Sequence, residues 1–510
     1  MDKIKTRYIS AALAFSLFAC SASCGEVVNK SSDSGSQSAQ EAQEALSPAV
    51  ADGEDIDSPE GSSAEVQEAV TTAVTTTAET TTVTTTTTQP AVMKGNVYDA
   101  DGDLLMYSTR DGNGKEIRSF NQDYKISCAN LLSEMSEGYD LIFEEKLRTP
   151  NPSPVGGERA VGQSIQLTID ADVQNAVYNY MEQMNIVGSV VVMRADGSIM
   201  SQVSCPSYNP DYFYGTDYEE DLAWGTYGNK AFQNAEPGST FKMMSEVIAD
   251  KHGIYSLWDE GEWTDDGATI VNWDHDRNTS YPFERSLYSA FVNSSNIYFA
   301  KTFQQVGKEA VLADLDSIFH FITPIDCDFG EIHNNVEIYC NDDLRRTAFG
   351  QSYVLTCPIY LAALCHEAVL GDMVTPFVLK NSVDTNDFGS ITKAGSEPFD
   401  VIASIPAEYR QNLLDGMSGV ASGLGVYVPY GYTLYAKTGT AETWVGDFLY
   451  ITGCLRTESG NDVVSADYSD YSGSYVVVMQ VQNPGYFSFD FASESAQLYQ
   501  GLINIVAGQQ

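Results

Sequence analysis

The strand patterns in this chain fall into two groups that lie far apart in the sequence, and this spacing restricts the fold. Gly188 to Met193 is a continuous apolar, β-branched run, and Ile199 to Val203 follows it after an Asp-Gly turn signal. Three more strand-like runs come much later: Leu434 to Ala436, Phe448 to Cys454 and Tyr475 to Val481. Since helices are expected in the sequence between the two groups, we predict an α+β fold. In it, one antiparallel sheet takes strands from both ends and is flanked by helices.

A helix is expected beside each group of strands. Ile165 to Ile169 alternates as a strand, and Asp170 after it can cap a helix that begins near Ala171. Apolar residues then recur at helical spacing: Val173, Ala176, Val177, Tyr180, Met181 and Met184. A second amphipathic pattern, over residues 498–505, follows the last strand.

Residues 25–92 have a composition that does not support a packed core. Ser, Ala, Glu, Asp and Thr dominate, and the stretch ends in a near-homopolymer of threonine between Thr71 and Thr88. So few large apolar side chains do not offset the entropy of ordering the backbone. We expect a disordered tether, either a stalk that holds a folded head away from its anchor or a passive linker, and both alternatives predict the same sequence.

Ordered patterning resumes at Gly95. Residues 93–161 contain short strand-like pieces, Asn96 to Tyr98 and Leu104 to Tyr107, with Asp-Gly turn signals. This segment is expected to form a small, β-rich N-terminal pedestal. Residues 162–510 are then the main domain.

The first 24 residues have the pattern of an export signal. Basic residues precede an apolar stretch from Ile9 to Ala19 that is too short to span a bilayer. Leu17-Phe18-Ala19-Cys20 resembles a lipoprotein processing box, so Cys20 is the favoured lipid anchor and Cys24 a second candidate. A simple cleaved secretion signal and an uncleaved anchor helix are the alternatives. We expect an extracytoplasmic protein anchored to the outer face of the cytoplasmic membrane.

Acidic residues greatly outnumber basic ones. Against 27 Lys and Arg stand 70 Asp and Glu, a formal net charge of -43, and such a chain repels phosphate backbones, which argues against a nucleic-acid partner. The nine cysteines show no C-x-x-C spacing, so no metal site is indicated. Cys327 and Cys340 bracket a short segment and are one candidate disulfide, although spacing alone does not fix the connectivity.

Ser239 and Lys242 form an S-x-x-K motif within Glu236-Pro237-Gly238-Ser239-Thr240-Phe241-Lys242. The preceding Pro and Gly, and the helical pattern that runs from there to Gly253, predict that Ser239 lies at a helix start. Three residues apart on a helix, Ser239 and Lys242 share one face. A lysine with a lowered pKa can take the serine proton and activate the hydroxyl as a nucleophile. An isolated S-x-x-K is weak evidence, because an exposed lysine on a capped helix has the same pattern.

Ser294-Ser295-Asn296 is predicted to lie in the turn between two helical stretches, Phe283 to Val292 and Ile297 to Gln305. In that turn, Ser294 can relay a proton and Asn296 can hold a substrate amide. Taken alone, this tripeptide is more often a helix N-cap cluster.

Lys437-Thr438-Gly439-Thr440 lies on a strand-like run. Alternation directs Lys437 and Gly439 to one face of the strand and Thr438 and Thr440 to the other. Gly439 allows a ligand to approach the backbone closely. A cation on this strand can bind a carboxylate, and a free strand edge can pair with a peptide. Taken alone, this tetrapeptide is also common.

The three motifs occur in the order helix, inter-helix turn and strand, which is typical of penicillin-binding proteins and serine β-lactamases. Over most of residues 93–508 the chain resembles the class B penicillin-binding proteins. Asn229-Lys230-Ala231-Phe232 and the Ser239 motif are similar to the family's N-R-A... E-P-G-S-T-F-K run. Further similar segments are Gly162 to Asp170, Ser204 to Pro210, and Gly350-Gln351 followed by Thr356-Cys357-Pro358.

The resemblance implies a serine-type peptidoglycan D,D-transpeptidase. Such an enzyme acylates Ser239 with a stem peptide ending in D-Ala-D-Ala and passes the peptide to an amino acceptor, and β-lactams trap the same serine. The implied roles are Lys242 as general base, Ser294 and Lys437 as proton relay, Asn296, Thr438, Gly439 and Thr440 as substrate-binding residues, and the N–H groups of Ser239 and Thr440 as the oxyanion hole. No metal or organic cofactor is implied.

A glycosyltransferase partner is also typical of the family. Lys94 to Gly102 only partly resembles the family's R-G-x-I-x-D-R-N-G opening, with both arginines missing, and the pedestal is short. These two departures weaken the expectation of contacts with a glycosyltransferase.

Other functions stay open at this point. A D,D-carboxypeptidase or β-lactamase has the same fold and differs in whether water reaches the acyl-enzyme; Asn296 argues against the β-lactamase class whose second motif lacks that asparagine. A non-turnover β-lactam or muropeptide sensor usually carries a further membrane segment, and no second apolar stretch here is long enough. A surface adhesion protein with an inert domain has no need of three intact motifs.

Overall fold

The computed structural model describes residues 92–150, 161–212, 226–383, 400–443, 446–457, 472–483 and 491–508. The expected export signal with Cys20 and Cys24, and almost all of the expected tether, lie outside these ranges. No helix within them has both the length and the apolar character that crossing a bilayer requires.

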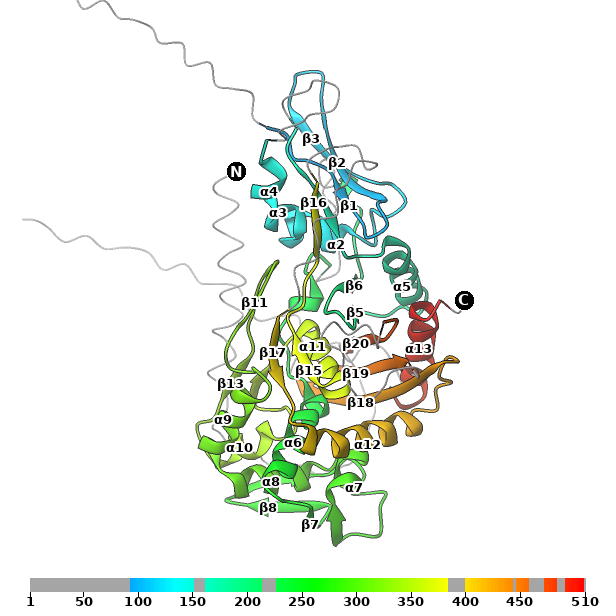
Figure 1. Cartoon of the computed structure of the whole chain (residues 1–510). Coiled ribbons are helices and arrows are strands. Elements are labelled where there is room, and N and C mark those ends of the chain that lie inside the picture. Colours follow the sequence, from blue (N-terminus) through cyan, green and yellow to red (C-terminus); the bar gives the residue numbers. More distant parts are fainter. Residues whose placement is uncertain are drawn as a thin grey trace, which may run out of the picture. The chain divides into compact units, whose positions relative to one another are not determined.

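An antiparallel five-stranded sheet forms the centre of the main domain, with the strand order β18-β19-β20-β5-β6. Its strands are β5 (Gly188–Arg194), β6 (Ile199–Cys205), β18 (Tyr432–Thr443), β19 (Gly446–Thr457) and β20 (Tyr475–Asn483). The two groups of strands meet where β20 pairs with β5, and Figure 1 shows them side by side. The prediction of one sheet built from both ends is confirmed.

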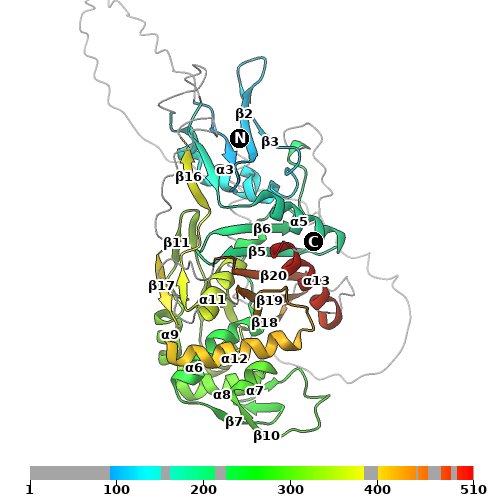
Figure 2. The ribbon, with the colours of Figure 1, turned by 45° about the vertical axis from the view of Figure 1, so that its right-hand side comes forward.

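Helices cover both faces of this sheet (Figures 1 and 2). On one face, α5 (Ala171–Gln183) and α13 (Phe491–Val506) bury side chains such as Met181 in a cluster with the apolar residues of β19 and β20. The expected cap of α5 is confirmed, because Asp170 Oδ1 accepts a hydrogen bond from the Val173 N–H at 2.9 Å.

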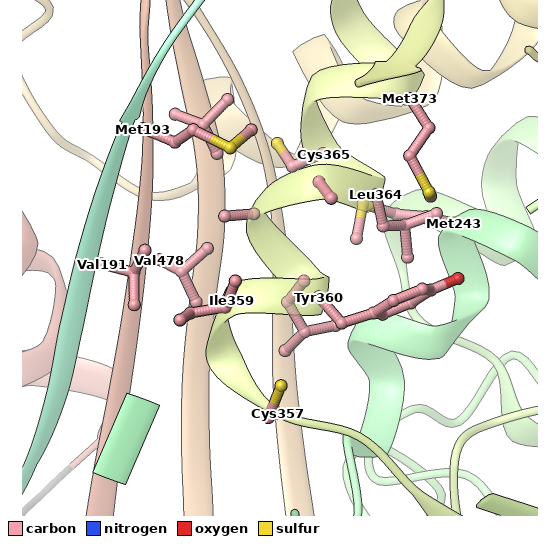
Figure 3. Close-up of a cluster of buried hydrophobic side chains, with 14 of the residues drawn as sticks. Val191, Met193, Met243, Cys357, Ile359, Tyr360, Leu364, Cys365, Met373 and Val478 are labelled. Atoms are coloured by element: carbon pink, nitrogen blue, oxygen red, sulfur yellow. The ribbon is translucent and has the colours of Figure 1, made fainter. Parts of the chain in front are cut away.

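The other face is covered by α11 (Pro358–Leu370), of which every residue is buried. A helix that is apolar all round is expected where other elements enclose it. Figure 3 shows Ile359 of α11 beside Val478 of the sheet, with Met243 of α6 (Lys242–Lys251) on the far side of the helix. The helix that carries Lys242 is therefore part of the core.

In the chain between the two groups of strands, helices alternate with short strands. Its larger elements after α6 are β7 (Ser256–Asp259), β8 (Glu262–Asp265), β9 (Ala268–Val271), β10 (Phe283–Ser286), α7 (Leu287–Val292), α8 (Asn296–Val306), α9 (Lys308–Ser317) and α12 (Ala407–Gly423). The helix expected from Phe283 is wrong in its first turn, since Phe283–Ser286 pairs with β7 as an antiparallel strand. The physical reason is that Arg285 is buried in an ion pair with Asp259 and that Ser286 caps α7.

Short elements complete the main domain. They are β11 (Ile325–Cys327) with β12 (Gly330–Ile332), β13 (Asn335–Glu337) with β14 (Tyr353–Leu355), β15 (Asp372–Val374) with β17 (Val401–Ser404), and α10 (Asn341–Thr347). All the cysteines in the described ranges are free thiols. Cys327 is buried and Cys340 is exposed, so the candidate disulfide between them is not formed.

The pedestal contains strands and short helices. They are β1 (Val97–Tyr98), β2 (Leu104–Arg110), β3 (Glu116–Phe120), α2 (Ala129–Leu132), α3 (Tyr139–Ile142) and α4 (Glu144–Arg148). Its sheet has the order β16-β4-β1-β2-β3. Because β4 (Ser164–Leu167) and β16 (Leu379–Val383) come from beyond residue 162, the sheet takes strands from both sides of the boundary expected there.

Lys94 takes part in a buried ion cluster inside the pedestal. Its Nζ lies 2.8 Å from a carboxylate oxygen of Asp140 and 2.9 Å from one of Glu134. Arg118 also pairs with Asp140, which has no exposed surface. Paired cations make the burial of this carboxylate tolerable. Lys94 thus supplies a charge at the position of the family's first arginine.

Candidate active site

Ser239 lies on a short 3₁₀ turn, Gly238–Phe241, that leads directly into α6. Residues three apart nearly eclipse each other on a 3₁₀ turn, so Lys242 comes to lie over Ser239. The distance between Lys242 Nζ and Ser239 Oγ is 2.9 Å. The predicted juxtaposition is confirmed, although the α-helix itself begins at Lys242 and Ser239 is on the turn before it.

Glycines allow this turn to pack between two other segments. Gly238 has a φ of +52°, and a Cβ on it would lie 2.3 Å from the carbonyl oxygen of Thr440. On the other side, the Gly238 N–H donates to the carbonyl of Gly350 at 3.0 Å. A Cβ on Gly350 would lie 2.1 Å from the Gly238 oxygen. Only glycine fits at these two positions, and the turn is fixed against β18.

Lys242 is the centre of the site. Its side chain has no exposed surface, and Nζ lies within hydrogen-bond distance of Ser239 Oγ, of the Ser294 carbonyl at 2.8 Å, of Ser294 Oγ at 3.1 Å and of Asn296 Oδ1 at 2.7 Å. Burial, and then the nearby charge of Lys437, lower the pKa of Lys242 well below its usual value. A neutral amine in this position is a base in contact with the Ser239 hydroxyl.

The second motif occupies the predicted turn between α7 and α8. Ser294 has a φ of +55°, which is uncommon for a residue with a side chain. Ser295 is the N-cap of α8, where its hydroxyl accepts from the Tyr298 N–H. The N-cap interpretation therefore holds for the middle residue, while the residues on either side, Ser294 and Asn296, contact Lys242.

The third motif lies on β18, the terminal strand of the sheet order. Lys437 is fully buried with Nζ 3.2 Å from Ser294 Oγ, and burial lowers its pKa to about 7. Thr438 is half-buried and Thr440 is exposed, in keeping with the expected alternation. The structure thus brings Ser239, Lys242, Ser294, Asn296 and Lys437 together by direct contacts.

The surroundings of Gly439 differ from those that we predicted. We expected its missing side chain to leave room for a ligand, whereas a Cβ here would lie 2.9 Å from the Pro237 oxygen and 3.0 Å from the Thr240 nitrogen. The space beside Gly439 is therefore taken by the turn that carries Ser239. The glycine lets the first and third motifs approach each other.

Two aromatic residues that sequence reasoning missed lie beside the lysines. Lys242 Nζ is 5.9 Å from the ring centroid of Phe349, and Lys437 Nζ is 5.6 Å from that of Phe291. Both distances are within the range of a cation–π contact. No local pattern distinguishes these rings from other core residues. Among the described residues, no group of three or more His, Cys, Asp or Glu is arranged to hold a metal ion.

Comparison with known families identifies the domain. The family model of the penicillin-binding protein transpeptidase domain matches residues 188–485, more than half of the chain. The chain belongs to this family. The match covers all three motifs, and it confirms the resemblance to class B penicillin-binding proteins.

Relatives of this penicillin-binding protein are moderately similar in sequence. A protein of Mesostigma viride named peptidoglycan D,D-transpeptidase FtsI homolog is 24% identical over 439 residues, which are 73% of this chain and 69% of that protein. Stage V sporulation protein D of Bacillus subtilis (strain 168) is 27% identical over 355 residues, 66% of this chain. The aligned part is 51% of that protein, so the chain matches only about half of its length.

Solved structures of penicillin-binding proteins share the fold. The imipenem acyl-enzyme complex of penicillin-binding protein A from M. tuberculosis superposes with a TM-score of 0.66 at 19% identity and covers 82% of this chain and 99% of that one. Penicillin-binding protein 2 of Pseudomonas aeruginosa, in complex with WCK 5153, gives 0.62 at 18% identity, over 81% and 96% of the two chains. The agreement extends beyond the catalytic core, since both alignments cover most of the described residues.

Proposed function

We propose that this protein is a peptidoglycan D,D-transpeptidase that cross-links stem peptides through an acyl-Ser239 intermediate. The observation that carries the proposal is the buried amine of Lys242, whose pKa is lowered and which lies 2.9 Å from Ser239 Oγ. A relative over 73% of the chain bears the name peptidoglycan D,D-transpeptidase, and a structural neighbour was solved as a β-lactam acyl-enzyme.

Acylation begins with proton transfer from Ser239 Oγ to Lys242 Nζ as the oxygen attacks the carbonyl carbon of the penultimate D-alanine. The N–H groups of Ser239 and Thr440 stabilise the oxyanion. Ser294 lies between Lys242 and Lys437, gives its hydroxyl proton to the departing nitrogen and takes the proton held by Lys242 in return, so that D-alanine leaves as the tetrahedral intermediate collapses and Lys242 is neutral again.

An amino group of a second stem peptide then attacks the acyl-enzyme. It loses a proton to the same base, and the Ser239 hydroxyl is regenerated. Asn296 holds the substrate backbone amide, Thr438 and Thr440 bind the terminal carboxylate, and the donor peptide lies along the β18 edge. A β-lactam acylates Ser239 by ring opening, and its leaving nitrogen stays attached to the acyl group.

The proposal includes the placement of the enzyme. Residues 1–24 direct export, Cys20 carries the lipid anchor, and residues 25–92 tether the pedestal (93–161) and the transpeptidase domain (162–510) at the outer face of the cytoplasmic membrane. The support is the pattern of the first residues and the substrate, which lies outside the cytoplasm. A glycosyltransferase that supplies nascent glycan strands is a candidate partner, although the departures in the pedestal weaken that expectation.

The adduct formed with penicillin tests this function. We expect full-length protein incubated with benzylpenicillin to gain the mass of one intact penicillin, stable over an hour. With a D-Ala-D-Ala peptide and an excess of amine acceptor, we expect the cross-linked amide as product. An adduct lost within minutes would indicate a hydrolase, a stable adduct without transfer to the amine would indicate a sensor, and no adduct would refute the proposal.

The rate of acylation should depend on pH through Lys242. Protonation removes the base, so the rate constant falls as pH drops through the lowered pKa of Lys242. Because the charge of Lys437 contributes to that lowering, Lys437→Met should move this acid limb to higher pH. Stopped-flow acylation by penicillin, measured from pH 5 up to the usual lysine pKa, gives the acid limb of each protein. An acid limb near the usual lysine pKa in the wild type would contradict the assignment of Lys242 as the base.

A further inference from the structure

Two consecutive residues, Asn272 and Trp273, hold the two ends of the second motif. Asn272 Oδ1 accepts hydrogen bonds from the backbone N–H of Asn296 at 2.7 Å and of Ile297 at 3.2 Å. Trp273 Nε1 donates to the carbonyl of Asn293 at 2.9 Å. Ser294 and Ser295 lie between these contacts, and the φ of Ser294 lies in the left-handed region. Its position therefore depends on both ends being held.

Asn272 is itself fixed by a buried carboxylate. Its amide Nδ2 lies 2.9 Å and 3.1 Å from the two oxygens of Asp259. Asp259 also accepts from Arg285 Nε at 2.5 Å and from Ser295 Oγ at 2.7 Å. None of these four side chains is more than 3% exposed. With its oxygen on the helix N–H groups and its nitrogen on the carboxylate, the Asn272 amide has a single favourable orientation.

This cluster contacts the second motif, and the second motif in turn contacts Lys242. Ser294 and Asn296 provide three of the oxygen atoms within hydrogen-bond distance of Lys242 Nζ. A displacement of the turn by about 1 Å removes these contacts, and misplacements of that size cost up to roughly 100-fold in rate. The same cluster also buries charge and caps α8, so a role in stability alone is the competing explanation.

We propose that Asn272, anchored by Asp259, is a positioning residue that sets the second motif against Lys242. The inference rests on the proposed function, because it concerns the acylation of Ser239. It predicts that the hydrogen bond between residues 259 and 272 determines the acylation rate, beyond its effect on folding.

A reciprocal exchange of the two side chains tests the proposal. Asn272→Asp places two carboxylates against each other, and Asp259→Asn removes the partner of Arg285. We expect each single variant to acylate at least about tenfold more slowly than the wild type. The double variant Asp259→Asn with Asn272→Asp restores a carboxylate–amide pair between positions 259 and 272 and keeps an acceptor for the α8 N–H groups. Because Arg285 still faces an amide in place of its carboxylate, we expect a partial recovery, to at least about threefold above the rate of the slower single variant.

A matched control separates positioning from stability. Asn130 is as buried as Asn272 and its Oδ1 also accepts a hydrogen bond, from Ser136, but it lies in the pedestal. Asn130→Ala and Asn272→Ala should both lower the thermal midpoint of the full-length protein. Only Asn272→Ala should slow acylation per folded molecule and move its acid limb to lower pH, because Lys242 loses acceptors that favour its charged form.

The outcomes distinguish this inference from the function on which it rests. Wild-type protein that forms no penicillin adduct would refute the proposed function itself. Wild-type acylation together with equal rates and equal pH profiles in Asn272→Ala and Asn130→Ala would overturn the positioning role. Failure of the double exchange to recover, when its thermal midpoint has recovered, would overturn it as well.

Discussion

Ser239→Ala is expected to abolish the penicillin adduct and the transpeptidation product together, while the fold is kept. The methyl group lacks the oxygen that becomes acylated, so no neighbouring group substitutes for it. Ser239 is only half-buried and its hydroxyl contacts the Lys242 amine. Its removal should therefore change the free energy of unfolding by less than about 1 kcal/mol. Intact mass spectrometry and thermal unfolding of the same sample check both parts.

Ser245→Ala is the matched control on the same helix. Ser245 is fully buried on α6, and its hydroxyl donates to the Ala348 carbonyl at 2.7 Å. Its loss leaves a buried carbonyl without this donor and should cost about 1–2 kcal/mol. The variant should still form the adduct. If Ser239→Ala retained the adduct, another nucleophile would have to be sought.

Lys242→Met should slow acylation by about 1,000-fold and at the same time stabilise the protein. The slower rate follows from the loss of the base, since a positioned general base contributes roughly 10²–10⁴-fold. The gain in stability follows from linkage. The folded-state pKa lies below the unfolded value, so burying this amine costs free energy at every pH below the unfolded pKa. Methionine removes that cost, and we expect this to outweigh the loss of the hydrogen bonds to the Ser294 carbonyl and Asn296 Oδ1, so that the free energy of unfolding rises at pH 7.

Lys251→Met, at the end of the same helix, should give the opposite pattern. Lys251 forms an ion pair with Asp314, whose side chain is almost fully buried. Removal of the cation leaves this carboxylate with His252 alone, so stability falls while acylation stays at the wild-type rate. Stopped-flow kinetics and urea unfolding compare the two variants. A destabilised Lys242→Met with unchanged kinetics would contradict a catalytic amine.

The sequence predicted those parts of the fold that leave a local signature. The apolar, strand-like runs of β5, β6, β19 and β20 are visible within a few residues, and the Asp170 cap follows from one side chain and its neighbours. The three motifs could be assigned to a helix start, an inter-helix turn and a strand for the same reason. That they meet at Lys242 followed from the family resemblance and not from periodicity.

What escaped prediction depends on contacts between distant segments. The sequence predicts that Phe283–Ser286 begins a helix. However, Arg285 forms an ion pair with Asp259 on β7, and the segment pairs with β7 as an antiparallel strand. Nothing near Asn272 in the sequence indicates that its amide will cap α8 from another loop. Gly439 was assigned to a ligand because the turn that packs on it lies some 200 positions away in the chain. In each case the residue that determines the structure is far away in the sequence, so a short segment gives no sign of the contact.

The pairing of β20 with β5 ties the reactivity of Ser239 to the completion of the chain. Gly188 to Arg194 is synthesised long before Tyr475 to Val481, which must pair with it to complete the sheet. Such a long loop makes assembly slow, because the entropy of closure precedes the gain from contact. Until β18 arrives, Lys242 lacks both the neighbouring charge of Lys437 and the burial that lower its pKa. If the proposed function holds, an incompletely folded chain therefore carries an ordinary protonated lysine, and its serine does not react with a β-lactam until the last strands are in place.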